Sequence, residues 1–191
     1  MANNFRNGHP KRTFEKKYTK YGSYKPYLAK DFFNRCGYTD CPDFWFGGTN
    51  NFHIDHFIPW KNYPNKPELK TDYKNLVYSC SYVNILKSND EGDYIDPCDV
   101  DFNSHFERDA LGNIIPKKES VHANYMFKQL KLFMKRYQVI WVLELLFGKM
   151  EKLQEVIDKT DEGAFKNDLL ITQGQLAGLM LKYKKYLSKS L

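Results

Sequence analysis

The sequence has no apolar segment long enough to cross a membrane. Its most apolar run, residues 139–147, is interrupted by Glu144, and no N-terminal stretch has the apolar core of a signal peptide. We therefore expect a cytoplasmic protein with no membrane partner. The hydrophobic content of 42% is nevertheless enough for a buried core, and 191 residues allow one compact domain with an appendage or two small domains.

Cysteine is scarce, and the four residues present lie between positions 36 and 98. In a secreted protein they could form two disulfides, but without an export signal a metal site is the better interpretation. The alternative is a set of buried or unpaired thiols. The candidate ligands are Cys36, Cys41, Cys80 and Cys98.

Charge is unevenly distributed along the chain. The net charge of +6 favours a polyanionic partner, although it does not separate DNA, RNA and an acidic membrane surface. Residues 1–35 contain nine Lys and Arg against two acids, residues 36–95 five against eight, and residues 96–191 fifteen against thirteen. Because the middle region is acidic, residues that bind phosphate must come largely from the other regions or from a partner chain.

The most informative segment is HIDHFIP at residues 53–59, which is followed by asparagines at positions 75 and 84. Asp55 can give a hard, anionic oxygen to a divalent cation, and Asn84 can give a second, uncharged oxygen. His56 can take a proton from water near neutral pH. These residue types in this order are those that a metal-dependent nuclease needs.

The same segment predicts a small strand, strand, helix unit. Residues 52–58 alternate partly and stop at Pro59, and residues 76–80 form a second β-rich run. Residues 60–74 contain prolines and little periodicity, which predicts a surface loop. We expect a helix after Ser79 or Ser81 as its cap, with positions 84, 87 and 88 on one face.

Residues 36–90 resemble the HNH endonuclease family through these positions and through the NLVYSC and NILK segments at 75–80 and 84–87. The resemblance implies an α+β protein with a ββα-metal core and hydrolysis of phosphodiester bonds in nucleic acid, with DNA as the expected substrate in preference to RNA. It also implies Mg²⁺ or Mn²⁺ held by Asp55 and Asn84, with His56 as the general base. Asn75 would pin the loop that carries the base, and Lys87 would contact the substrate phosphate. His53 could be an additional ligand, but a supporting residue or an ordinary strand histidine is the favoured interpretation.

The cysteine spacing departs from this family. Many HNH proteins hold the core with two CxxC pairs, whereas the first pair here is C-x4-C and the expected partner of Cys80 is Val83. Cys98 is the remaining thiol that would complete a four-sulfur Zn²⁺ site, which requires the chain to fold back after the catalytic helix.

The two flanking regions have different compositions. Residues 1–35 form a basic, tyrosine-rich arm in which Lys16, Lys17 and Lys20 are candidate phosphate contacts, or whose rings pack on the domain surface. Residues 36–95 are the nuclease core. Residues 96–191 predict a loop, a short hairpin near Gly112 and a mostly α-helical extension, with one helix from near Ser120 to Asp158 and a last lysine-rich helix.

This C-terminal layout more loosely resembles the HNH nucleases that accompany ATPase subunits in bacterial anti-phage systems of the Septu or retron-associated type. The resemblance implies an ATPase partner docked on the helical region, and a role for His105 in supporting the active site or holding the domain together. Two alternatives to a nuclease are a non-catalytic, zinc-stabilised nucleic-acid binding module and an interaction subunit. A binding module, however, has no need of a base beside a carboxylate.

Overall fold

The computed structural model describes residues 3–188 and divides the chain into two compact units, Met1–Phe133 and Met134–Leu191. The first unit mixes short strands and helices, and the second is helical. The α+β fold class with a helical C-terminal region is therefore confirmed.

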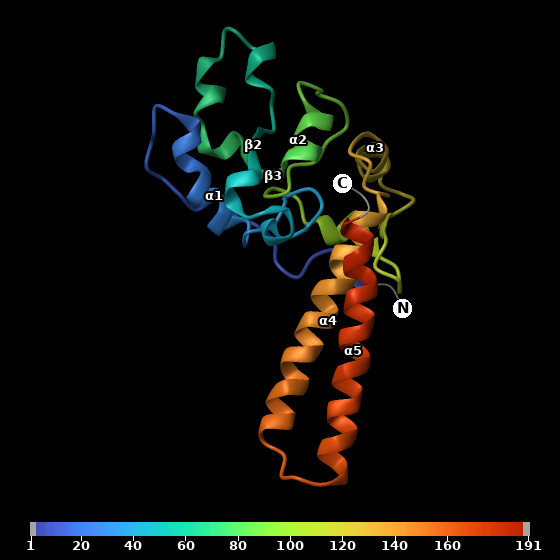
Figure 1. The fold of residues 1–191 in the computed structure, drawn as a ribbon. Coiled ribbons are helices and arrows are strands. Elements are labelled where there is room, and N and C mark those ends of the chain that lie inside the picture. The colour runs from blue at the N-terminus through green and yellow to red at the C-terminus, as the bar shows by residue number, and fades with distance from the viewer. Residues whose placement is uncertain (1–2, 189–191) are drawn as a thin grey trace. The chain divides into compact units, whose positions relative to one another are not determined.

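A ββα unit lies at the centre of the first compact unit (Figure 1). Strands β2 (Phe52–His56) and β3 (Leu76–Cys80) pair antiparallel, with Asp55 opposite Val77. All five residues of β3 are buried, as expected for a β-rich run in the core. Helix α2 (Ser81–Lys87) follows β3 directly. The predicted order of elements is thus present, and β2 ends at His56.

The start of α2 differs from the prediction. Its N-cap residue is Cys80, and no side chain caps the helix, so neither Ser79 nor Ser81 has that role. Ser79 is buried, and its hydroxyl donates to the Cys80 carbonyl. The helix ends where Ser88 adopts a positive φ of 48°.

The segment between β2 and β3 contains no long helix but a series of tight turns, as its prolines predict. Short 3₁₀ turns recur along the whole first unit. They are Tyr21–Tyr24, Asp43–Phe46, Thr49–Asn51, Trp60–Asn62, Pro67–Lys70, Tyr73–Asn75 and Phe102–Ser104.

A second, three-stranded sheet joins the two ends of the first unit. Strands β4 (Phe106–Arg108) and β5 (Ile114–Pro116) form the predicted hairpin, and β1 (Asn3–Asn4) pairs with β4. The guanidinium of Arg108 is buried and donates to three backbone carbonyls, those of Phe5, Gly112 and Thr39. Because each donor has an acceptor, burial of this charge holds three segments together.

The N-terminal arm packs onto the first unit over much of its length. Within the arm, the Phe14 ring stacks on Tyr27 of helix α1 (Lys25–Asp31), with 3.8 Å between centroids, and it also lies 5.6 Å from the ring of Tyr73 outside the arm. Arg12 donates to the carboxylate of Asp96 at 2.8 Å. These contacts correspond to the interpretation in which the aromatic rings of the arm pack on the domain surface.

The single helix expected from Ser120 to Asp158 is wrong, since the structure has two. Helix α3 (Val121–Gln129) is capped by the Ser120 hydroxyl, and α4 (Lys135–Asp158) begins only after Lys131 takes a positive φ of 49°. Leu130 and Leu132 are both buried beside this break. The apolar pattern is continuous through the break, which is why periodicity alone joined the two helices.

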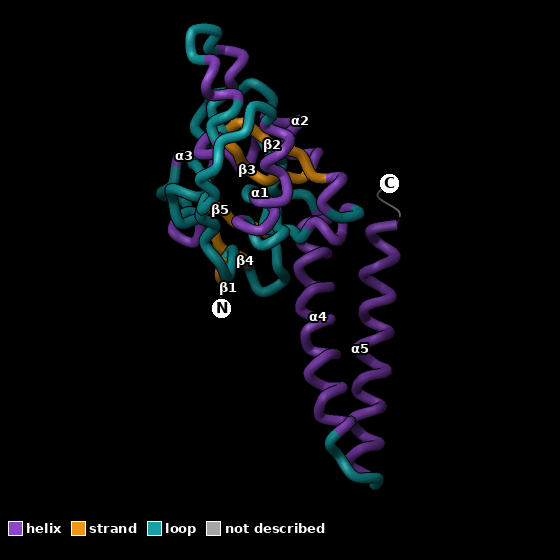
Figure 2. The backbone as a smooth tube through the Cα atoms, turned by 90° about the vertical axis from the view of Figure 1, so that its left-hand side faces the viewer, coloured by secondary structure: helices purple, strands orange, loops and turns teal. Residues whose placement is uncertain are grey.

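In the second unit, α4 and α5 (Ala164–Ser188) lie side by side and run antiparallel (Figures 1 and 2). Gly163 lies in the turn between them and has a positive φ of 157°. No helix within residues 3–188 is long and apolar enough to cross a membrane.

Candidate active site

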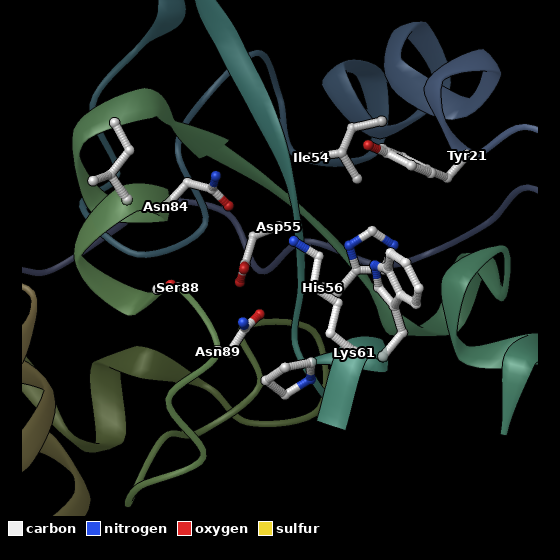
Figure 3. Close-up of a pocket in the computed structure, with 11 residues that line it drawn as sticks. Tyr21, Ile54, Asp55, His56, Lys61, Asn84, Ser88 and Asn89 are labelled. Atoms are coloured by element: carbon white, nitrogen blue, oxygen red, sulfur yellow. The ribbon is translucent and has the colours of Figure 1, made fainter. Parts of the chain in front are cut away.

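Three of the predicted site residues line one open pocket of about 370 Å³ in the first unit (Figure 3). Asp55 and His56 reach it from the end of β2, and Asn84 reaches it from α2. Because the strand ends at His56, two adjacent residues contribute to the same pocket instead of pointing to opposite faces of a sheet. The other lining residues are Tyr21, Ile54, Pro59, Trp60, Lys61, Ile85, Ser88 and Asn89.

Asp55 lies at the bottom of this pocket and is only 3% exposed. Its Oδ2 accepts a 2.5 Å hydrogen bond from the Tyr38 hydroxyl and lies 3.4 Å from the Lys87 ammonium. Among the described residues, none donates to its other oxygen, Oδ1. Burial raises the pKa of Asp55 to about 6, although Lys87 and Tyr38 oppose the rise.

Lys87 is the residue whose predicted role the structure changes. Its side chain is fully buried, and its ammonium donates to the carbonyls of His56 and Phe57 at 3.0 Å each. In this position it contacts Asp55 and the backbone, so it does not face a substrate phosphate as expected. It positions the carboxylate and the end of β2 instead.

The His56 ring is held in one orientation. Its Nε2 lies 2.9 Å from the Lys70 carbonyl, and because a carbonyl only accepts, Nε2 carries the proton. The neutral ring then has its lone pair on Nδ1. Tyr21 packs edge-on against the imidazole at 4.9 Å. Burial lowers the pKa of His56, aided by the charges of Lys87 and Lys70 and opposed by the carbonyl hydrogen bond.

Asn75 ties together the two ends of the loop that follows His56. Its amide donates to the carbonyls of Ile58 and Leu69, both at 2.9 Å, and its oxygen accepts from the Ile58 amide. Leu69 immediately precedes Lys70, whose carbonyl holds the His56 ring. Asn75 thus makes the loop contact expected of it, and this contact fixes the hydrogen-bond partner of His56.

Asn84 lies opposite Asp55 across the pocket, and Figure 3 shows its amide oxygen on the side of the carboxylate. Its amide nitrogen lies 3.2 Å from His53 Nδ1. His53 is exposed and does not line the pocket, so its contact with Asn84 is that of a supporting residue. A neutral His53 that accepts from the Asn84 amide leaves the amide oxygen free for the pocket.

The donors in this pocket fit a hard divalent cation. One carboxylate oxygen without a protein donor and one amide oxygen face a space that is open to water. Mg²⁺ commonly takes few protein ligands of this type and keeps several positions for water and phosphate oxygens.

The four cysteines do not form the expected zinc site. No cluster of three or more His, Cys, Asp or Glu side chains suited to a metal occurs within residues 3–188. Cys36, Cys41 and Cys80 are buried, whereas the backbone of Cys98 bonds to Asp96 and His9. Although burial opposes ionisation, hydrogen bonds from Cys80 and Thr39 lower the pKa of Cys36 to about 6. Cys36, Cys41 and Cys80 are therefore buried, hydrogen-bonded thiols in place of the predicted set of four metal ligands.

The remaining predicted residues lie outside the pocket. Lys16, Lys17 and Lys20 are exposed on the arm, and their contact with phosphate stays a prediction. His105 Nδ1 lies 2.6 Å from the Ser120 hydroxyl, which caps α3. This contact is the structural role considered for His105.

Sequence reasoning missed several residues that shape the pocket. Tyr38 binds Asp55, Tyr21 packs on His56, and Trp60 lies beside the same imidazole at 6.3 Å. Tyr38 and Tyr21 are distant from the HIDH segment in sequence, and tyrosine is abundant here, with 14 residues. No local pattern separated these rings from the other aromatic residues.

Comparison with known proteins adds one match. The family model described as HNH endonuclease matches residues 34–90. No curated protein and no solved structure matches the chain. The matched segment supplies Asp55, His56, Asn75 and Asn84. It therefore corresponds to an HNH endonuclease domain, which indicates a nuclease or a nucleic-acid-interacting role.

Proposed function

We propose that the protein is a metal-dependent endonuclease that hydrolyses phosphodiester bonds in DNA, with His56 as the general base. The observation that carries this proposal is the orientation and the protonation of the His56 ring. With Nε2–H bound to the Lys70 carbonyl, the Nδ1 lone pair is available for a proton beside Asp55 and Asn84. A histidine of lowered pKa stays neutral near pH 7, as a base must.

The roles of the other residues follow from their contacts. His56 would take the proton of the attacking water, and the Lys70 carbonyl would stabilise the imidazolium that results. Asn75 would keep that carbonyl in place. Lys87 and Tyr38 would hold Asp55 with Oδ1 toward the pocket.

Asp55 and Asn84 would hold one Mg²⁺ or Mn²⁺, which supplies Lewis-acid stabilisation of negative charge on the phosphate and the departing oxygen when bound. A site with one base and one cation cuts one strand at a time. We therefore expect nicked circles as the first product from supercoiled DNA.

Asn75→Ala is expected to lower the cleavage rate by about 10- to 100-fold, because His56 loses the fixed orientation that the pinned loop gives it. The variant should keep its affinity for the cation, since Asn75 does not line the pocket. Steady-state nicking rates and Mn²⁺ titrations measure the two quantities.

Asn124→Ala is the matched control for this prediction. Asn124 also donates to backbone carbonyls, at Lys117 and Ser120, but on α3 and away from the pocket. Equal losses of activity in the two variants, or none in Asn75→Ala, would contradict the positioning role.

Cation affinity is expected to rise with pH through a region centred near pH 6. Asp55 has a pKa of about 6, so it is protonated below this pH and must lose a proton to bind the ion. Excess cation should therefore move the low-pH limb of the rate profile to lower pH, because binding favours the carboxylate. Calorimetric titration with Mg²⁺ from pH 5 to 8 tests this, and affinity that is constant over this range would contradict the coupling of cation binding to a raised pKa of Asp55.

The alternatives make different predictions. A non-catalytic binding module predicts that His56→Ala leaves function intact, and an interaction subunit predicts that only loss of the helical region matters.

The proposed role in anti-phage defence, with an ATPase bound to the helical region, is tested by pull-down of an ATPase from cells that express the tagged chain.

A further inference from the structure

One face of α5 exposes large apolar side chains. Leu170 is 45% exposed, Ile171 61% and Leu181 60%. An isolated two-helix hairpin has no closed core, and contiguous exposed apolar surface on a soluble protein marks an interaction site. These side chains therefore mark a candidate interaction surface on α5.

Two glycines lie on the same face, between these apolar residues. At 3.6 residues per turn, Leu170, Ile171, Gly174, Gly178 and Leu181 fall within about 100° around the helix axis. We call this set the α5 stripe. A Cβ added to Gly174 or Gly178 would meet no atom within 4 Å, so packing inside the hairpin does not require glycine at either position. Glycine within a helix costs about 1 kcal/mol relative to alanine, which suggests another use.

The α5 stripe is complementary to itself when two copies of α5 run antiparallel. About a two-fold axis near residue 176, Gly174 faces Gly178 of the second copy, and Ile171 faces Leu181. A two-fold interface has this property, because each contact between two positions is made twice. The glycines would lie where the helices cross, and their small size would allow close approach.

The charges at the two ends of α5 are also complementary. The last turns carry Lys182 and Lys184, with no acid in residues 179–188. At the other end, Lys166 pairs with Glu162 at 2.7 Å, which leaves Asp161 and Asp168 as an acidic excess. An antiparallel arrangement brings the basic end of each helix to the acidic end of the other.

We propose that the α5 stripe is the contact between two copies of this chain, packed antiparallel and crossing at Gly174 and Gly178. The second copy is the occupant because the two glycines, the Ile171–Leu181 pair and the charges at the two ends match their own reversal. This inference is independent of the proposed nuclease activity and depends only on the second unit.

Sedimentation equilibrium of the full-length chain over a concentration series tests the proposal directly. The wild type should form dimers, and Ile171→Glu/Leu181→Glu should weaken the dimer by about 100-fold or more, because four carboxylates enter the contact. Phe165→Glu is the control, since Phe165 is 64% exposed on the opposite face of α5. A monomeric wild type, or a dimer unchanged by the double substitution, would overturn the proposal.

Gly174→Leu tests whether Gly174 is needed for the close approach of the two α5 helices or only affects the stability of its own helix. It should raise the thermal stability of the hairpin, since leucine favours a helix, while weakening the dimer by about tenfold. If Gly174 has no role in the dimer contact, the substitution should change the thermal stability of the hairpin and leave the dimer affinity unchanged. An unchanged or tighter dimer would exclude crossing at the glycines.

A charge exchange identifies the second copy as the occupant. One chain carries K182E and K184E, and another carries D161K and D168K. Each alone should be largely monomeric at low salt because like charges meet, whereas their mixture should form heterodimers. Failure of the mixture to associate would overturn the antiparallel arrangement.

Discussion

His56→Ala is expected to slow phosphodiester cleavage by about 10²- to 10⁴-fold, the usual contribution of a general base. The loss should appear in kcat, because the imidazole acts on water and is not expected to hold the substrate. Single-turnover rates with a nicked-circle readout measure this effect. Mg²⁺ affinity should be unchanged, since the proposed ligands are Asp55 and Asn84.

A histidine outside the pocket provides the control for this prediction. His122 lies on α3 beside Asp93 and is half exposed, so His122→Ala should retain full activity. His53→Ala should have an intermediate effect, because Asn84 would lose its contact at 3.2 Å. Full activity in His56→Ala would remove the base from the proposed mechanism.

Lys87→Met is expected to destabilise the protein by about 3–5 kcal/mol. The substitution keeps much of the volume of a fully buried side chain but leaves Asp55 as a buried carboxylate without its cation. It also leaves the carbonyls of His56 and Phe57 without a donor. Urea unfolding at pH 7 measures the change in the free energy of unfolding.

The double variant Asp55→Asn/Lys87→Met tests the reason for this loss. If an uncompensated carboxylate causes most of it, the double variant should be more stable than Lys87→Met alone. Because Asp55 has a raised pKa of about 6, Lys87→Met should also be less destabilised near pH 5, where the carboxyl is largely protonated. Equal instability at both pH values would show that the ion pair is not the cause.

The local sequence predicted the core of the site because its residues are close together along the chain. Asp55 and His56 are adjacent, and Asn75 and Asn84 bracket one strand and the start of one helix. Chemistry and order were therefore sufficient to place Asp55, His56 and Asn84 around one pocket, and Asn75 on the loop whose end contacts His56. The end of β2 at His56 supplied the bend that the two adjacent side chains required.

The errors have separate physical reasons. Helical spacing placed Lys87 on the same side as Asn84 but did not give its depth, and the side chain is buried beneath Asp55. Continuous apolar periodicity concealed the break at Lys131, where the backbone is left-handed. Counting thiols did not show that Cys98 lies beside Asp96 and His9. Each depends on tertiary packing, which single-sequence patterns do not contain.

The most direct test of the central claim is incubation of the purified chain with supercoiled plasmid in Mg²⁺ or Mn²⁺, beside a chelator control and Asp55→Asn. The account predicts nicked circles that require the cation and the carboxylate. Single-stranded DNA and RNA, assayed in parallel, give the substrate class. If the chain binds the cation yet cleaves none of these substrates, the proposal of a nuclease active by itself is contradicted.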